Sequence, residues 1–320
     1  MKQTTLGSTE WALKTKVTRR AQFLAEMEAV VPWPRLLAVI EPYYPKAEQG
    51  RPPHPLPRML RIYCMQQWFN LSDPAAEDML YDSESMRRFA GIDLTAELVP
   101  DETTILRFRH LLEKHRLTER LFAEVRQLLE EKRLLLKSGT IVDATIIAAP
   151  PSTKNAAQAR DPEMKQTRKG KQWHFGMKVH IGTDRRGLVH SVVTGPASES
   201  DITRLDDLLH GEERELFGDQ AYWSEDHRQH CRHAGIDYRV NRRAKAGRTL
   251  TDHEKAINRS RSRHRARGEH PFQVVKHLWG FTKVRYRGLY KNTVRALALF
   301  ALSNLYLARR MLMPRPERCA

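Results

Sequence analysis

Apolar side chains recur with a helical period up to about residue 137. Runs such as AQFLAEMEAVV, RLLAVIEPYY and LPRMLRIYCMQQWF, and a longer run over residues 103–136, place hydrophobic residues three and four positions apart. This spacing is typical of amphipathic helices that bury one face. Prolines and glycines separate the runs, as expected between short helices: Pro32, Pro42, Pro45, Pro52, Pro53, Gly91 and Pro100. We therefore predict an α-helical domain over residues 1–137.

The hydrophobic period changes at Gly139. The β-branched run GTIVDATIIAAP is followed by QWHFGMKVHIGTD and GLVHSVVTGP, and the turn at residues 184–187 predicts that the last two form a hairpin. Further elements are expected in the order helix (DITRLDDLLHG), strand (ERELFGD), helix (SEDHRQHCRHAG), strand (IDYRVNRR), basic connector, helix (269–279), candidate strand (TKVRYRG) and helix (from residue 293). This order predicts a mixed α/β sheet covered by helices over residues 138–320. The polar, mostly basic segment 154–172 is expected to be a mobile loop.

The charge balance points to an anionic partner. The 320 residues, enough for two domains, hold 55 Lys and Arg against 38 Asp and Glu, a formal charge of +17 with a pI near 10.0. Such a charge attracts phosphate backbones and is screened by salt. Ribosomal or membrane-surface association would fit the charge as well, so charge alone only favours nucleic acid.

Cysteine usage and hydropathy favour a cytoplasmic protein. The three cysteines, Cys64, Cys231 and Cys319, are far apart and form no CxxC motif, which predicts reduced thiols. We expect neither a signal peptide nor a membrane span. The most apolar stretch, ALALFALSNLYLA, is shorter than the roughly 20 residues that a span needs and contains Ser303 and Asn304. It is expected to be a buried helix.

Three carboxylates stand out as candidates for chemistry. Asp143 is the only charged residue in an apolar strand, where a carboxylate is costly unless it faces a cleft, a hydrogen-bond cluster or a cation. Asp219 closes the strand ELFGD, at the strand end where open α/β sheets place their sites. Glu269 shares a predicted helical face with Lys276 and follows Arg265 by four residues. The alternatives are an exposed edge-strand aspartate, a capping aspartate and a weak surface ion pair, respectively.

A metal site would explain these acids. Three oxygen ligands without a histidine or cysteine cluster suit Mg²⁺ or Mn²⁺ rather than zinc. Two such ions can activate a water or a 3′-hydroxyl and stabilise the leaving oxygen at phosphorus. Residues 239–287 hold fifteen Lys or Arg and three acids, a field suited to DNA phosphates around a metal site. From the residues alone this is a hypothesis.

The same segments resemble the DDE transposases of bacterial insertion sequences, in the IS-four and IS-five-like branch. The resemblance covers nearly the whole chain and is carried by VPWPRLLAVIEPYYPK, PDETTILRFRHLLE, TIVDATIIAAPPSTKN, RDPEMKQTRKGKQWHFGMKVHIG, GDQAY and RARGEHPFQVVKHLWGFTKVRYRGLYKN. The signature around the third acid of that family is Tyr, two residues, Arg, three residues, Glu, six residues, Lys. Arg265, Glu269 and Lys276 match it, and Ser262 stands where the tyrosine is expected.

The resemblance implies a function and a fold. It implies an RNase H-like mixed sheet flanked by helices, preceded by an α-helical domain that binds the terminal inverted repeats, in a protein of the bacterial nucleoid. Asp143, Asp219 and Glu269 would be the catalytic triad and would hold two Mg²⁺ or Mn²⁺ ions, while Arg265 and Lys276 contact phosphates. The enzyme would free a 3′-OH at each element end and join it to target DNA, and a dimer on DNA is expected.

Other DNA contacts are expected from basic segments. The helix PDETTILRFRHLLEKHR presents Arg107 and Arg109, and the loop 154–172 presents Lys169 and Lys171 as a clamp. The alternatives are an ordinary solvated helix face and a merely soluble loop. HRQHCRH is expected to be an amphipathic helix rather than a zinc site, and Trp173, Trp223 and Trp279 could stack on an unpaired base or pack in a core.

Two other functions remain open from the sequence. One is an RNase H-like nuclease, such as a junction resolvase, that cuts DNA without joining it. The other is a non-catalytic DNA-binding remnant of a transposase. Only a catalytic function requires the three acids to meet in one cleft.

Overall fold

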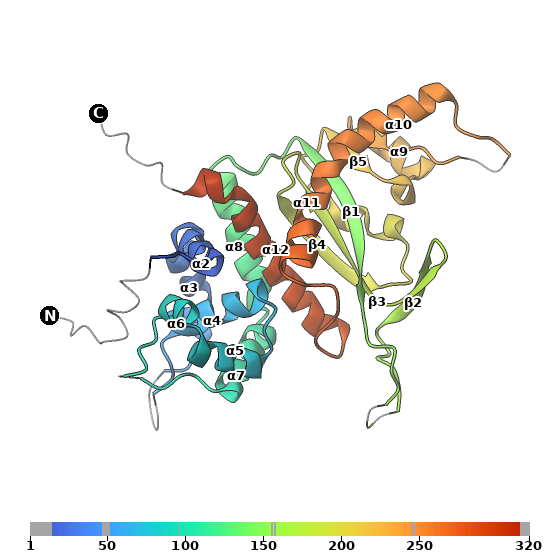
Figure 1. The fold of residues 1–320 in the computed structure, drawn as a ribbon. Helices are drawn as coiled ribbons and strands as arrows, with labels where there is room; N and C mark the ends of the chain where they lie inside the picture. Colours follow the sequence, from blue (N-terminus) through green and yellow to red (C-terminus); the bar gives the residue numbers. More distant parts are fainter. Residues whose placement is uncertain are drawn as a thin grey trace, which may run out of the picture.

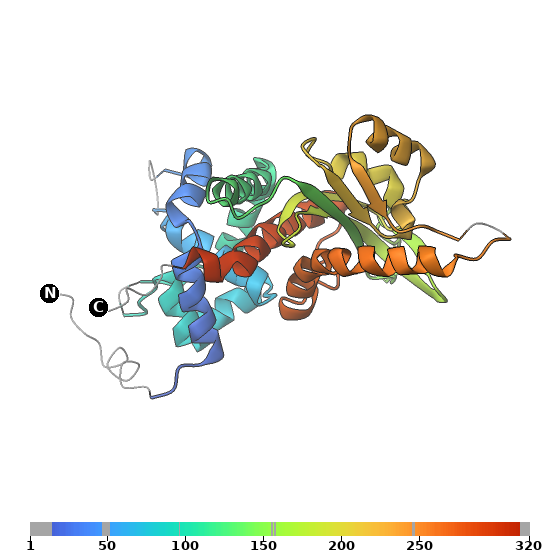
Figure 2. The ribbon, with the colours of Figure 1, turned by 90° about the horizontal axis from the view of Figure 1, so that it is seen from above.

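The computed structural model describes residues 15–46, 52–95, 97–154, 156, 158–244 and 247–313. The predicted domain ends at residues 1–14 and 314–320, with Cys319, lie outside this part. A helical region and a mixed sheet lie side by side, and the last helix runs between them (Figures 1 and 2). The helices of the first region are α2 (Arg19–Val30), α3 (Trp33–Ile40), α4 (Leu56–Trp68), α5 (Asp73–Asp82), α6 (Glu84–Ala90), α7 (Glu102–Lys114) and α8 (Leu117–Glu131).

Local sequence signals set the ends of these helices. Thr18, Ser72 and Asp101 each accept a hydrogen bond from a backbone N–H in the first turn of α2, α5 and α7, respectively. Gly91 ends α6 in the left-handed conformation, with φ 68°. The long run over residues 103–136 is two helices rather than one, because Arg116 adopts a left-handed φ of 51° between α7 and α8. The predicted helical region is otherwise confirmed.

The sheet is mixed, as the sequence predicted. Its strands are β1 (Gly139–Ala148), β2 (Lys165–Lys169), β3 (Gln172–Thr183), β4 (Val189–Pro196), β5 (Glu215–Gly218) and β6 (Asp237–Val240). Strand β3 pairs antiparallel with β1, β2 and β4, whereas β1, β5 and β6 are parallel neighbours. The predicted hairpin at residues 184–187 is β3–β4, and its Asp184 carboxylate accepts hydrogen bonds from three backbone N–H groups.

The remaining elements cover the sheet. Helices α9 (Glu225–His233) and α10 (Asp252–Arg265) lie on opposite sides of it (Figure 2). A short 3-10 turn (Ala266–Gly268), α11 (Glu269–Phe272) and a π-helical segment (Gln273–Leu278) continue the path of α10, and α12 (Leu289–Leu312) ends the described chain. Short 3-10 turns cover Glu41–Tyr43, Asp201–Arg204, Asp206–Leu208 and Gln220–Tyr222.

Helix α12 joins the helical region to the sheet. It packs against α8, α2 and α4 on one side and against β4 on another, and one cluster of buried residues extends through all of them. The Asn304 side chain explains why an amide interrupts this apolar run: it accepts from Val189 N–H and donates to Val189 C=O of β4, both at 2.7 Å. The expected buried helix is confirmed, although it starts at Leu289 rather than residue 293.

Four local predictions were wrong. Residues 201–211 form two short 3-10 turns instead of a helix, and the segment 154–172 contains strand β2 instead of being only a loop. The basic connector before Glu269 is largely helix α10, which begins with a capping box between Thr251 and Glu254. The candidate strand TKVRYRG is reduced to one isolated bridge between Lys283 and Ala148.

Two further sequence expectations concern thiols and membrane spans. Cys64 and Cys231 are buried and form no disulfide, as expected, and burial raises the pKa of both thiols. Within the described residues, no helix combines the length and the apolar character needed to cross a bilayer.

Candidate active site

The two candidate aspartates occupy equivalent positions on neighbouring parallel strands. The β1–β5 pairing ends at Ile141 and Phe217, and Asp143 and Asp219 each follow two residues later. Side chains two residues apart on a strand point to the same face of the sheet. Since Ile141 and Phe217 are paired, the carboxylates of Asp143 and Asp219 are expected on the same face and at the same level of the sheet. Beyond Ile141, β1 continues beside β3 while the chain after β5 turns away at Asp219. The separating strands therefore leave an opening between the two acids.

Glu269 reaches this opening from the helical layer. Gly268, immediately before it, packs so closely on β1 that an added Cβ would lie 2.8 Å from Ile141 Cγ2. A glycine at this position lets the helical path approach the strand, and Glu269 then faces the opening. All three predicted acids line one cleft of about 960 Å³ between β1, the β5 end and the α10–α11 path.

Asp143 is the most perturbed of the three. Its side chain is 14% exposed, and burial raises its carboxyl pKa to about 6. The negative charges of Asp219 and Glu269 also contribute to this rise, whereas Arg265 and the Ala144 N–H, which donates to Oδ1 at 2.9 Å, oppose it. Mutual repulsion among the three acids shows that they share one electrostatic environment. A raised carboxyl pKa in a cleft is typical of a functional site.

Asp219 and Glu269 are more accessible. Asp219 is half-buried, and its Oδ1 accepts from the Ala221 N–H at 2.8 Å, so the alternative reading of a capping aspartate is also true of it. This bond fixes the carboxylate at the cleft wall and leaves Oδ2 without a hydrogen bond among the described residues. The Glu269 side chain is 58% exposed, so it can adjust to a ligand at small energetic cost.

Arg265 lies between two of the acids. Its Nη1 is 3.7 Å from Asp143 Oδ2 and its Nη2 is 3.3 Å from Glu269 Oε1. The ion pair with Arg265 that the sequence offered as an alternative role for Glu269 is therefore present. The same guanidinium also faces Asp143. Arg265 supplies positive charge where two carboxylates converge, which is the charge that a divalent cation would supply.

The fit of this site to a metal is partial. The acids provide hard oxygen donors, which suit Mg²⁺ or Mn²⁺. Yet, in the described part of the chain, no three Asp, Glu, His or Cys side chains are close enough together to hold a metal ion. In this structure the Arg265 guanidinium, and not a metal ion, forms the ion pairs with both Asp143 and Glu269.

Lys276, for which the resemblance implies a phosphate contact, lies at the wall of the cleft. Its Nζ donates to Thr145 Oγ1 at 2.9 Å and to the Ile146 carbonyl at 3.3 Å, so the ammonium is held at the cleft wall beside β1. Burial lowers its pKa, and the nearby Lys169 lowers it further. The two lysines therefore concentrate positive charge in the part of the cleft next to the acids.

A fourth acid lines the cleft that sequence reasoning did not select. Asp201 begins the segment that was expected to be a helix, and its carboxylate pairs with Lys178 Nζ at 2.8 Å; both residues line the cleft beside Asp219. His180 lies 3.8 Å from the same Asp201 oxygen and is fully buried, and burial lowers its pKa to about 4. The alternation of Lys178 and His180 on β3 was the available signal, since it places both side chains on one face.

The other predicted DNA contacts differ in placement. Lys169 and Lys171 are exposed at the β2–β3 turn, and Lys169 lines the cleft. Arg107 is exposed on α7. Arg109 is buried and paired with Asp73 at 3.1 Å and Glu113 at 2.7 Å, so its position gives no support to the predicted DNA contact. Of the three tryptophans, Trp173 is exposed, Trp279 is buried and Trp223 is half-buried.

Two family models match the chain. The family described as Transposase DDE domain matches residues 134–305, more than half of the 320 residues, and the family described as Transposase domain (DUF772) matches residues 11–111. The chain belongs to the DDE transposase family. The sequence prediction of a transposase is thereby confirmed, and the family implies DNA as the partner and nuclease or transferase chemistry as the activity. No solved structure matches the chain.

Proposed function

We propose that this transposase binds the ends of an insertion sequence, cleaves the DNA to free 3′-OH groups and joins them to target DNA. The observation that carries the proposal is the position of Asp143 and Asp219, each two residues beyond the last paired residue of neighbouring parallel strands, with Glu269 facing the same cleft. The basic lining of the cleft by Lys169, Arg265 and Lys276 supports a polyanionic substrate.

Asp143, Asp219 and Glu269 are proposed to hold two Mg²⁺ or Mn²⁺ ions. Bound there, the ions would activate the attacking water or 3′-hydroxyl and stabilise the leaving oxygen. The chain itself contributes positioning: Lys276 holds a point of positive charge against β1, and Arg265 offers a planar fork to a phosphate once it leaves Asp143. The raised pKa of Asp143 implies that its ionised form gains from an incoming cation.

We also propose that the sheet has the RNase H-like fold and that the chain belongs to the IS-four and IS-five-like branch. A sheet in which β1 lies between antiparallel β3 and parallel β5, with β6 beyond β5 and β4 beside β3, supports the RNase H-like class. The match of Arg265, Glu269 and Lys276 to the third-acid signature supports the IS-four and IS-five-like branch of bacterial elements. Ser262, where that signature has tyrosine, accepts a hydrogen bond from Asn241 Nδ2 at 3.1 Å and so anchors α10 beside β6.

The two predicted domains are assigned separate tasks. Residues 1–137 are proposed to bind the terminal inverted repeats, with Arg107 as an exposed candidate, and residues 138–320 to carry the catalysis. Helix α12 packs against both α8 and β4, which supports a fixed arrangement of the DNA-binding and catalytic domains. Because two element ends must be cut in concert, we propose a dimer on DNA.

A strand-transfer assay tests the function. Labelled duplexes that carry the inverted repeats flanking the gene are incubated with the protein, a target plasmid and Mg²⁺ or Mn²⁺, beside the Asp143→Asn variant. Cleavage at the repeat end followed by joining, absent in the variant, is expected. Cleavage without joining would favour the RNase H-like nuclease, and repeat binding without cleavage in either ion would favour the non-catalytic remnant.

A further inference from the structure

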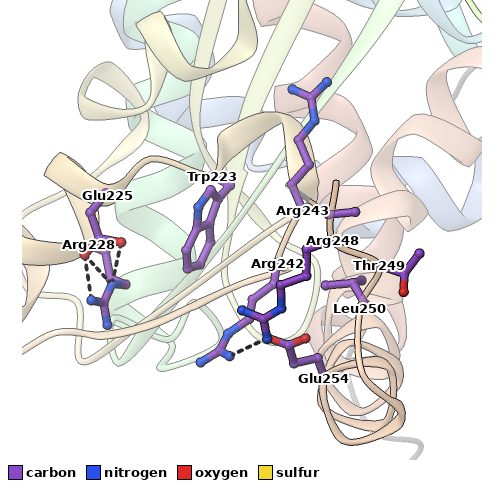
Figure 3. A pocket seen from close by; sticks show the side chains of 10 residues that line it. Trp223, Glu225, Arg228, Arg242, Arg243, Arg248, Thr249, Leu250 and Glu254 are labelled. Atoms are coloured by element: carbon purple, nitrogen blue, oxygen red, sulfur yellow. Dashed lines mark hydrogen bonds and ion pairs between the residues drawn. The ribbon is translucent and has the colours of Figure 1, made fainter. Parts of the chain in front are cut away.

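A second hollow lies apart from the catalytic cleft, at the start of α10. It encloses about 210 Å³ and is lined by Trp223, by four arginines and by two glutamates, together with Ala244, Thr249 and Leu250. The arginines are Arg228, Arg242, Arg243 and Arg248. Figure 3 shows the Trp223 indole between the Glu225–Arg228 pair on one side and the other arginines on the other. We call this hollow the arginine recess.

Positive charge in the arginine recess exceeds the acids that could neutralise it. Arg228 pairs with Glu225 at 2.6 Å, but Arg242 and Arg248 both bind the same Glu254 oxygen, each at 3.2 Å. Arg243 extends away from Glu254 in Figure 3, and its guanidinium has no hydrogen bond or ion pair to any other described residue. Four guanidinium groups against two carboxylates leave the recess with a net positive charge.

The recess is built on fixed elements. Glu254 is the third helical residue of α10, and its other oxygen accepts from the Thr251 N–H at 3.0 Å in the capping box. The backbone of Arg242 exchanges two hydrogen bonds with the Asn258 side chain, at 3.0 and 3.1 Å, and these tie the segment after β6 to α10. The Trp223 ring packs on Tyr238 at 5.6 Å. The Arg242 backbone, Glu254 and the Trp223 ring are therefore held in place before any ligand arrives.

The recess suits a phosphate. Arginine forks bind phosphate oxygens through paired hydrogen bonds, and the first turn of a helix adds a favourable dipole for an anion. A phosphate can take the place of Glu254 as the acceptor shared by Arg242 and Arg248, while Glu254 keeps its capping role. A neighbouring hollow shares Trp223, Arg228 and Arg242 and adds Arg232 and Arg261, so the basic surface continues past the recess.

Helix α10 connects the recess to the catalytic cleft. It begins at the recess with Asp252 and ends at Arg265, which pairs with Asp143 and Glu269. Its 14 residues span about 21 Å at 1.5 Å per residue. Since a duplex rises about 3.4 Å per base pair, this length corresponds to roughly six base pairs.

We propose that the arginine recess binds a backbone phosphate of DNA about six base pairs from the scissile phosphate. The recess thereby fixes the direction in which DNA leaves the catalytic cleft along α10. This inference rests on the proposed function, because it takes the carboxylate cleft as the place of cleavage. Element-end DNA and target DNA carry the same phosphate chemistry, and the experiment separates them.

The test uses the full chain and a variant that carries Arg242→Gln, Arg243→Gln and Arg248→Gln. Glutamine keeps most of each side-chain stem, and the Thr251 cap still satisfies Glu254. We expect binding of a duplex to weaken about tenfold and the slope of log K against log salt to become shallower by about one per lost phosphate contact. The single variant Arg243→Gln, which breaks no side-chain hydrogen bond or ion pair between described residues, should show a smaller loss in the same direction with unchanged thermal unfolding.

A matched control removes the same charge elsewhere. Arg214→Gln, Lys291→Gln and Arg310→Gln act on exposed residues of the catalytic domain that line neither the cleft nor the recess, and they should leave the salt slope near that of the unaltered protein. If the control and recess variants lose equal DNA affinity, the loss is caused by the lower overall charge, and the proposal is overturned. Methylphosphonate substitutions scanned along the duplex should lower the affinity of the unaltered protein at one position and have no effect there in the recess variant.

The same measurements separate the DNA source and the two proposals. A loss with duplexes bearing the inverted repeat but not with target plasmid assigns the phosphate to the element end, and the reverse assigns it to the target. If both recess variants bind every duplex as the unaltered protein does, the recess inference fails while cleavage of element ends stands. If the unaltered protein shows the recess-dependent slope but never cleaves, the proposed catalysis fails and the recess remains a DNA-binding site.

Discussion

The guanidinium of Arg265 lies 3.7 Å from the carboxylate of Asp143, and it is the cation that lowers the pKa of this acid. Replacing Arg265 by glutamine removes that charge, so the Asp143 pKa should rise above about 6. At pH 7.5 the ionised Asp143 carboxylate then lacks the positive charge that offsets its burial. We therefore expect the free energy of unfolding to fall by about 1–2 kcal/mol. Denaturant unfolding at pH 7.5 and pH 4.5 measures this.

The pH dependence makes the Arg265 prediction specific. At pH 4.5 the Asp143 carboxyl is protonated in the folded protein, so the difference between Arg265→Gln and the unaltered protein should shrink. Arg265→Lys keeps a positive charge and should lose less stability at pH 7.5. An equal loss at both pH values would show that Arg265 stabilises the fold by packing rather than by its charge.

Asp143 itself should destabilise the metal-free protein at neutral pH. Its folded pKa of about 6 exceeds the 3.8 of an unperturbed aspartate, so folding favours the protonated form, and the cost of the ionised form appears as pH rises from about 4 to about 6. Asp143→Asn should therefore raise the free energy of unfolding by roughly 2–3 kcal/mol at pH 7.5, and the gain should vanish below pH 4. Thermal or denaturant unfolding across pH 3.5–8 measures it.

A divalent cation should reverse the order of these two proteins. Under the proposed function Mn²⁺ binds the folded unaltered protein, so it should raise the melting temperature of that protein, whereas Asp143→Asn should respond weakly. Asp237→Asn, on the exposed end of β6, is the matched control and should change neither the metal response nor the pH profile. If Mn²⁺ stabilises Asp143→Asn as much as the unaltered protein, Asp143 is not a ligand.

The sequence was informative wherever a local pattern decides the structure. Asp143 is the one charge in an apolar strand, and Asp219 directly follows β5, the parallel neighbour of that strand, so their common position follows from strand periodicity and parallel topology. Glu269 could be placed only through the spacing to Arg265 and Lys276. The approach of its helical path to β1 depends on Gly268, a contact that strand or helix periodicity does not encode.

The sequence was uninformative wherever partners distant in the chain decide the structure. Strand β2 is polar and lacks strand periodicity, and it forms because β3 supplies its hydrogen bonds. Asp201 reaches the cleft because Lys178, 23 residues earlier on β3, holds it. Arg109 reads as a surface arginine in sequence, but Asp73, 36 residues earlier, is part of its ion pair.

Arg107 and Arg109 should behave oppositely when replaced. Arg109→Ala leaves the Glu113 carboxylate, 8% exposed, without its 2.7 Å partner and should cost about 3–5 kcal/mol of unfolding free energy. Arg107→Ala changes an exposed residue and should alter stability by less than about 0.5 kcal/mol. Under the proposed function it should weaken binding of inverted-repeat duplexes. A stable Arg109→Ala protein that binds DNA poorly would instead return Arg109 to the DNA-binding surface.

Lys276 should matter for cleavage far more than for folding. Its ammonium is held by Thr145 Oγ1 and the Ile146 carbonyl at the cleft wall, where a phosphate at the acids can replace one of these partners. Lys276→Met keeps the apolar stem but removes the charge, so single-turnover cleavage at saturating protein should slow by roughly 10²–10³-fold, the usual effect of losing one donor at a reacting centre. Thr145→Val removes only the hydroxyl partner and should cleave at nearly the original rate, while Lys276→Arg should recover part of it. Cleavage by Lys276→Met at the original rate would leave this lysine a structural contact of β1 and place the phosphate elsewhere in the cleft.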